Sequence, residues 1–248
     1  MRKQYRLTIF ILATSMLVAL SPLQVAAQSA NPVFSHPTRI LNPYLPFATL
    51  KQDILIGKSG SQTARVERTT LKRTRTFTFQ GHPIQTMIVV DKDFIGGKLE
   101  EVTFDYFAES DDGGVYYFGE DVNEYQNGTI VGHSGAWHYG VETNFLGLII
   151  PGRPQVGQKF QAENVPGITK ENDEIVSVTA KIRLGIGSYQ NVVKIKESYP
   201  DGSVEYKYYV PSVGTVSEIA PDGTVNLRQH ISCWQLGTPS DPDGLIRP

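Results

Sequence analysis

The sequence predicts an all-β protein built on one large, curled antiparallel sheet, an open half-barrel, with a β-sandwich as the alternative architecture. Apolar and polar residues alternate with a period of two along most of the 248-residue chain, as in strands with one buried face. Clusters of Gly, Asp and Pro bound these runs. No stretch shows a long amphipathic helix, although one short helical turn is expected at 169–173. A sheet of this size should curl and form a concave face.

The first residues predict a cleavable secretory signal peptide over 1–27. Arg2, Lys3 and Arg6 precede a mostly apolar run at 7–20, and Val25-Ala26-Ala27 places small residues at the cleavage position. The apolar run is about a dozen residues, whereas a bilayer span needs roughly 20. We therefore expect an exported protein, periplasmic or extracellular, with no transmembrane span after cleavage.

The remaining chain is expected to hold one folded domain. Residues 28–48 are rich in Pro and predict an extended N-terminal arm that docks through Tyr44, Leu45 and Phe47. Residues 49–237 predict a single β domain, and 238–248 a flexible C-terminal tail. The one cysteine, Cys233, cannot form an intrachain disulfide, so the fold must depend on its core. Its strand-like surroundings favour a buried, unreactive thiol.

The charge of the chain argues against two classes of partner. The net charge of −2 becomes −5 when the three positive charges of residues 1–27 are removed. Nucleic acids and anionic membranes attract basic patches. The composition therefore predicts no nucleic-acid binding.

The strands are expected in two series. The first series comprises runs at 64–68, 74–79, 84–90, 102–108 and 115–118, with turns at 80–83, 91–97 and 111–114. The second comprises runs at 175–184, 189–195, 204–210, 213–219 and 225–234. Pro-Asp-Gly at 200–202 and at 221–223 has the chemistry of tight turns, and predicts two hairpins within an antiparallel meander.

The segment 111–154 differs from the rest by concentrating acids, histidines, aromatics and glycines, a mixture that often carries function on a β scaffold. The leading hypothesis is a non-catalytic exported protein that binds a small apolar or lipid-like ligand on the concave face. Aromatic and aliphatic side chains line such sites. The candidate ligand-binding residues are Tyr106, Tyr117, Glu120, His133, Trp137 and His138.

A secreted hydrolase is the first alternative, and it would use acids and histidines of residues 109–142. Paired carboxylates, such as those of Glu120, Asp121 and Glu124, can perform acid–base chemistry on glycosides. No Gly-x-Ser-x-Gly nucleophile motif is present, and no individual catalytic residue is identified.

A calcium-stabilised interaction module is the second alternative. Glu109, Asp111 and Asp112 resemble a fragment of an oxygen-ligand calcium loop, although the full EF-hand spacing is absent. His133 and His138 are five residues apart and would point to opposite faces of one strand, so they do not predict a transition-metal site. No other cofactor is expected.

Several motifs together resemble a group of uncharacterised exported bacterial β-sheet proteins. They are the aromatic run Tyr117-Phe118-Gly119-Glu120, the Asn127-Gly128 turn, the Gly135-Ala136-Trp137 segment and Pro151-Gly152-Arg153-Pro154. This resemblance covers roughly residues 43–220 and implies no catalytic residues. The closing run 208–216 is similar to LolA-like half-barrels, which implies a curled sheet and, by analogy of fold alone, a lipid carrier.

Overall fold

The computed structural model describes residues 31–232, and these form a single antiparallel sheet of 14 strands without any helix. This confirms the all-β, curled-sheet prediction. The first series of strands is β1 (Leu50–Ser59), β2 (Gln62–Phe79), β3 (His82–Ile95), β4 (Lys98–Glu109) and β5 (Val115–Gln126). Three short strands pair with β5, namely β6 (Thr129–Gly132), β7 (Trp137–His138) and β8 (Gly147–Ile150). The second series is β9 (Lys159–Val165), β10 (Thr169–Leu184), β11 (Gly187–Ser198), β12 (Val204–Val210), β13 (Gly214–Ala220) and β14 (Gly223–Ser232).

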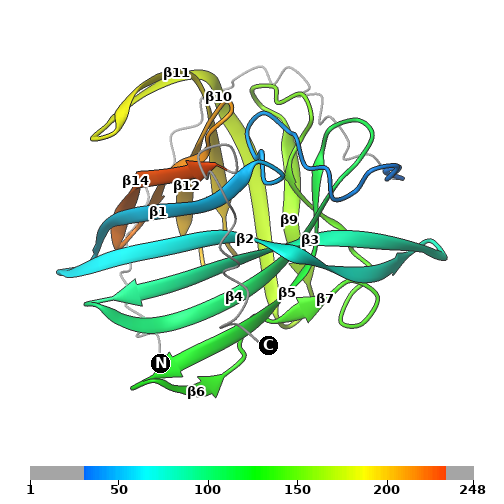
Figure 1. The fold of residues 1–248 in the computed structure, drawn as a ribbon, viewed down its shortest axis with the longest axis horizontal. Helices are drawn as coiled ribbons and strands as arrows, with labels where there is room; N and C mark the ends of the chain where they lie inside the picture. Colours follow the sequence, from blue (N-terminus) through cyan, green and yellow to red (C-terminus); the bar gives the residue numbers. More distant parts are fainter. Residues whose placement is uncertain (1–30, 233–248) are drawn as a thin grey trace, which may run out of the picture.

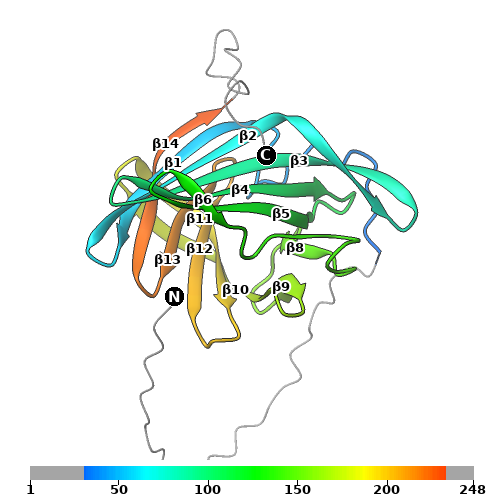
Figure 2. The same ribbon diagram turned by 90° about the horizontal axis from the view of Figure 1, so that it is seen from below.

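The two series join through β1 and β14, which pair antiparallel in the middle of the sheet. The hydrogen-bonded order is β6-β5-β4-β3-β2-β1-β14-β13-β12-β11-β10-β9. Its ends, β6 and β9, do not pair, so the sheet is curled and open. In Figure 1 the strands β1–β5 run across the view while β9 and β10 run nearly at right angles to them. Figure 2 shows the same two halves from below, curving around a common interior.

Two segments that were expected to form turns are strands in the structure. Residues 169–173 begin β10 instead of forming a helical turn. Residues 91–95 continue β3, and the chain turns only at Gly96 and Gly97. Asp91 and Asp93 suggested a turn, but both lie on the inner face of the strand. By contrast, both Pro-Asp-Gly turns are confirmed, because they connect β11 to β12 and β13 to β14.

The two ends of the sheet touch at a seam where β7 and β8 meet β9, but no continuous ladder of backbone hydrogen bonds joins them. Gly147 of β8 approaches β9 so closely that a Cβ there would lie 2.0 Å from the carbonyl oxygen of Ala162. Trp137 of β7 is fully buried and donates from Nε1 to the Glu163 carboxylate of β9, at 2.9 Å. Its ring meets Tyr117 edge to face, with 5.3 Å between the centroids. One indole therefore joins β5 and β7 to the far end of the sheet.

The N-terminal arm covers both faces of the β3–β5 region. Phe34 packs edge-on against Phe79, Tyr116 and Phe118 on the outer face. Leu45 and Phe47 are buried, as expected, and Phe47 lies against Phe107 of the inner face. A second, smaller apolar cluster comprises Leu55 of β1 with Val192, Val210, Val216 and Leu227 of β11–β14.

Replacing Trp137 with Ala should lower the free energy of unfolding by about 3–5 kcal/mol, because it removes a fully buried ring from the seam. Trp137→Phe keeps much of the apolar contact but leaves Glu163 without the indole donor. It should cost about 1–3 kcal/mol. Urea denaturation of the two variants measures both values, and an alanine variant as stable as the parent chain would show that the seam does not depend on this residue.

Candidate functional site

The cavity inside the curled sheet is the candidate site. It has a volume of about 490 Å³ and is lined by residues of both halves of the sheet and by the arm residues Leu45 and Phe47. Strand alternation decides which side chains reach it. On β4, Glu101, Thr103, Asp105 and Phe107 face the cavity, whereas Phe104 and Tyr106 lie on the outer face. The register places Glu120 of β5 directly opposite Asp105, so both carboxyl groups point inward.

The cavity wall is strongly acidic. Six carboxylates line it, and only two cationic side chains accompany them. The carboxylates belong to Asp91, Glu101, Asp105, Glu120, Glu163 and Glu171; the cations are Arg68 and Lys207. Because the net charge of the whole chain is only −2, this wall is a concentration of negative charge and does not simply reflect the average composition.

Each cation already has a carboxylate partner. The Arg68 guanidinium binds Asp91 through Nη2 at 2.6 Å and Glu218 at 3.3 Å. Nζ of Lys207 lies 3.2 Å from Oε2 of Glu197. The carboxylates at the β4–β5 end of the cavity therefore depend on other groups. Glu163 accepts from Trp137 and Thr169, and Asp105 accepts from the Tyr117 hydroxyl at 2.5 Å.

Burial and mutual repulsion hold protons on several of these acids. Burial raises the pKa of Glu120 to about 10, and the charges of Asp105 and Glu163 add to this. Burial also raises the pKa of Asp105 to about 7, where repulsion from Asp91 adds to the rise and the Tyr117 hydrogen bond opposes it. On the neighbouring β3, burial and repulsion from Asp91 raise the pKa of Asp93 to about 8. At neutral pH Glu120 is therefore largely protonated, and a positive charge placed nearby would favour ionisation of these carboxyl groups.

The structure divides the sequence-predicted ligand-binding residues between two faces. Tyr117 and Glu120 line the cavity, and Trp137 lies beside it. Tyr106 and His138 lie on the outer face, where the Tyr106 hydroxyl and His138 Nε2 both contact the Asp121 carboxylate. Arg75 completes this outer cluster by donating to Asp121 at 2.9 Å. His133 lies apart from both groups, with Nδ1 at 2.6 Å from the carbonyl oxygen of Val122.

The predicted calcium residues fix the N-terminal arm. One oxygen of Glu109 accepts from the backbone amides of Leu41 and Asn42, at 2.5 and 2.6 Å. Asp111 accepts from the amide and hydroxyl of Ser35, at 2.8 and 2.7 Å. Asp112 accepts from the Gly114 amide within its own turn, at 3.0 Å. Within residues 31–232 these three acids do not gather as a set of metal ligands, whereas three other carboxylates, described below, do.

Residues that sequence reasoning missed make up most of the cavity wall. Arg68, Asp105 and Lys207 lie in predicted strands whose polar positions were taken to face solvent. Asp91 was assigned to a turn, and Glu163 lies outside every predicted strand. The available signal was the number of acids at alternating positions on neighbouring strands. Those positions form a continuous polar face only once the sheet curls around them.

Comparisons of the chain with protein-family models, with curated proteins and with solved structures each found no match. No helix within residues 31–232 has the length and apolar character needed to cross a membrane.

The folded protein should lose stability as the pH rises from about 5 to about 8.5. The folded-state pKa values of Asp105 (about 7) and Asp93 (about 8) exceed the ordinary aspartate value of 3.8, so the folded state binds more protons than the unfolded state in this window. His230, whose pKa is raised by its hydrogen bond to Asp53, acts in the same direction. The thermal midpoint should fall by about 5 °C or more.

Differential scanning fluorimetry across this pH range measures the effect. Asp93→Asn should flatten the profile, because it removes an aspartate whose pKa is raised to about 8. A midpoint that stays constant or rises between pH 5 and 8.5 would contradict the buried acidic wall.

Proposed function

We propose that this chain is an exported, non-catalytic binding protein whose cavity takes a small organic ligand carrying one or more ammonium or guanidinium groups. The observation that carries the proposal is the cavity of about 490 Å³ with six carboxylates and only two cations in its wall. Its size lies within the range of small-molecule sites. Export rests on the pattern of residues 1–27, which lie outside the described residues.

The composition of the wall favours a cationic ligand over the apolar one expected from the sequence. Tyr106, which the sequence predicted to line the concave face, lies on the outer face together with Phe104 and Phe118. Those that line the cavity, including Phe47, Phe107 and Tyr117, stand among carboxylates. Aromatic faces and carboxylates together bind organic cations, through cation–π contacts and charge-assisted hydrogen bonds.

The raised pKa values of Glu120 and Asp105 also favour a cationic ligand on thermodynamic grounds. The pKa of Glu120 is about 10, so this side chain is protonated at neutral pH in the free protein. An ammonium group placed between Glu120 and Asp105 favours their ionised forms. Ligand binding near pH 7.5 is then accompanied by proton release, which would not accompany simple apolar binding at this wall.

Titration calorimetry with putrescine, spermidine, a neutral disaccharide and a fatty acid tests the proposal. We expect saturable binding of an amine, with an apparent enthalpy that changes between buffers of different ionisation enthalpy. The double variant Asp105→Asn/Glu120→Gln should weaken that binding by about tenfold or more. Glu100→Gln, which alters an exposed carboxylate of β4, is the matched control and should bind as the parent does.

Two outcomes would refute this function. One is saturable binding of the fatty acid without binding of either amine. The other is amine binding that the double variant and the Glu100→Gln control share equally.

A hydrolase remains the second candidate because of one specific pair. Asp105 and Glu120 face each other across β4 and β5 within the cavity. Directly opposed residues have Cβ atoms about 5 Å apart, and their environments separate the two pKa values, to about 7 and about 10. Such a pair can act as base and acid in glycoside hydrolysis. This candidate keeps Glu120 from the sequence-based hydrolase hypothesis but uses neither histidine.

A panel of chromogenic glycosides decides between the two functions. If the pair is catalytic, the parent chain and Glu100→Gln should turn over at least one substrate, and Glu120→Gln should lose about a hundredfold or more in rate. Turnover that survives unchanged in Glu120→Gln would remove this candidate.

A further inference from the structure

Three acidic side chains gather at the β10–β11 end of the sheet. Glu171 and Asp173 project from the same face of β10, and Glu197 of β11 is the cross-strand partner of Asp173. One carboxylate oxygen from each residue lies within 4.8 Å of the other two. All three side chains are directed toward the interior, and none is fully exposed. Their spacing suits a single ion held among them.

One oxygen of this cluster lacks a partner. Asp173 is only 4% exposed, and its Oδ1 accepts no hydrogen bond from the part of the chain that the structure describes. A buried, unsatisfied carboxylate oxygen is costly, and native proteins seldom leave one in this condition. This oxygen is a second, separate sign that the cluster receives a ligand from outside the chain.

Neighbouring side chains orient the other two carboxylates. The Tyr199 hydroxyl lies 3.0 Å from Oε2 of Glu171 and 3.2 Å from Oε2 of Glu197. Nζ of Lys207 lies 3.2 Å from the same Glu197 oxygen. Tyr199 and Lys207 thus fix one oxygen of each glutamate. A single lysine leaves the three carboxylates undercompensated.

The pKa values of the cluster reflect this excess of three carboxylates over one lysine. Burial and repulsion from Glu171 and Glu197 raise the pKa of Asp173 well above its ordinary range. Burial raises the pKa of Glu197 to about 7 even though Lys207 opposes the rise. Either a proton shared between Glu171 and Asp173, or a cation, must supply the missing positive charge.

We propose that Glu171, Asp173 and Glu197 form a binding site for a divalent cation of the calcium class. Three carboxylates are hard oxygen ligands, and the cluster includes no histidine or cysteine, so it favours calcium or magnesium over zinc or copper. Calcium suits it better, because the three side chains come from two adjacent strands and calcium accepts irregular geometry with water completing its shell.

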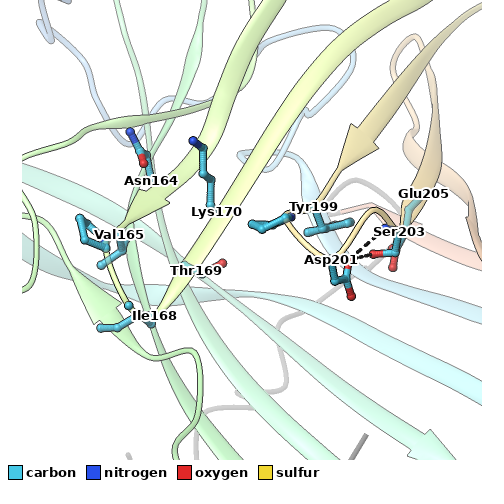
Figure 3. A pocket seen from close by; sticks show the side chains of 12 residues that line it. Asn164, Val165, Ile168, Thr169, Lys170, Tyr199, Asp201, Ser203 and Glu205 are labelled. Carbon is cyan, nitrogen blue, oxygen red and sulfur yellow. Dashed lines mark hydrogen bonds between the residues drawn. The ribbon is translucent and has the colours of Figure 1, made fainter. Parts of the chain in front are cut away.

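The cluster adjoins the inner cavity, because Glu171 lines that cavity. A cavity of about 680 Å³ lies between the β9–β10 and β11–β12 turns, and Figure 3 shows its lining side chains from both turns, among them Lys170 and Tyr199. Tyr199 also lines the inner cavity. The residue that orients Glu171 and Glu197 therefore stands between the two spaces. The ion site shares Glu171 with the wall of the inner cavity. Its variants change Asp173 or Glu197, whereas the amine test changes Asp105 and Glu120, so one proposal can fail without the other.

The test uses the purified chain after treatment with chelator and dialysis. Calcium should raise the thermal midpoint by about 5 °C or more at a concentration about a hundredfold above its Kd. It should also displace bound terbium and so remove the tyrosine-sensitised luminescence. Asp173→Asn should abolish both responses and, because it relieves repulsion, melt no lower than the calcium-free parent.

Asp93→Asn is the matched control. It also neutralises an inward-facing aspartate with a raised pKa, but leaves the cluster intact, so it should keep the full calcium shift. A calcium response equal in Asp173→Asn and the parent would overturn the proposal. So would the absence of any response in the parent to calcium, magnesium or terbium, an outcome that assigns the missing charge to a shared proton. Glu197→Gln provides a second test should Asp173→Asn fail to fold.

Discussion

The rest of this structure depends on one constraint: the curled sheet encloses many carboxylates and only a few cations. The curled sheet turns alternate residues of β2, β3, β4, β5, β10 and β12 toward a common interior, and most of the charged residues among them are acidic. Arg68 and Lys207 each neutralise part of this charge by pairing with Asp91, Glu218 or Glu197. The remainder is carried by protons or by whatever cation binds there. Two partly independent regions of excess charge result, one around Asp105 and Glu120 and one around Glu171 and Asp173.

The fold tolerates this interior because much of its aromatic packing lies on the outer face. Phe77, Tyr106 and Phe118 pack on the outer face with Phe34 of the arm and the loop that carries His138 and Tyr139. The acids of the β4–β5 turn hold that arm in place by accepting from its backbone amides. The sheet is therefore stabilised from outside, along its convex side, and by Trp137 at the seam. This arrangement frees the concave face for polar side chains.

The elements of the sheet could be predicted from the sequence, but the direction of its faces could not. Period-two alternation and the Asp-Gly turns predicted the strands and the antiparallel neighbours, because both depend on local chemistry. Local pattern does not say which way a strand bends. The assumption that aromatic residues face inward placed Tyr106 in the cavity and left Asp105 in solvent, whereas the curl of the sheet does the reverse. The acids of β3 suffered the same error, since Asp91 and Asp93 suggested a turn when they form part of the inner wall.

The candidate site was accordingly predicted in part. Tyr117 and Glu120 were identified from the unusual composition of their segment, but their partners Arg68, Asp105 and Glu163 are distant in sequence and come together only through the topology.

Carbon-13 NMR of the Glu120 carboxyl group during a pH titration is the most direct test of the acidic cavity, with Glu120→Gln used for assignment. We expect this carboxyl group to titrate near pH 10 in the ligand-free protein, because burial and its acidic neighbours raise its pKa to about 10. Titration near pH 4.5 would show instead that Glu120 is solvated and uncoupled from its neighbours, and that the acidic cavity does not hold protons.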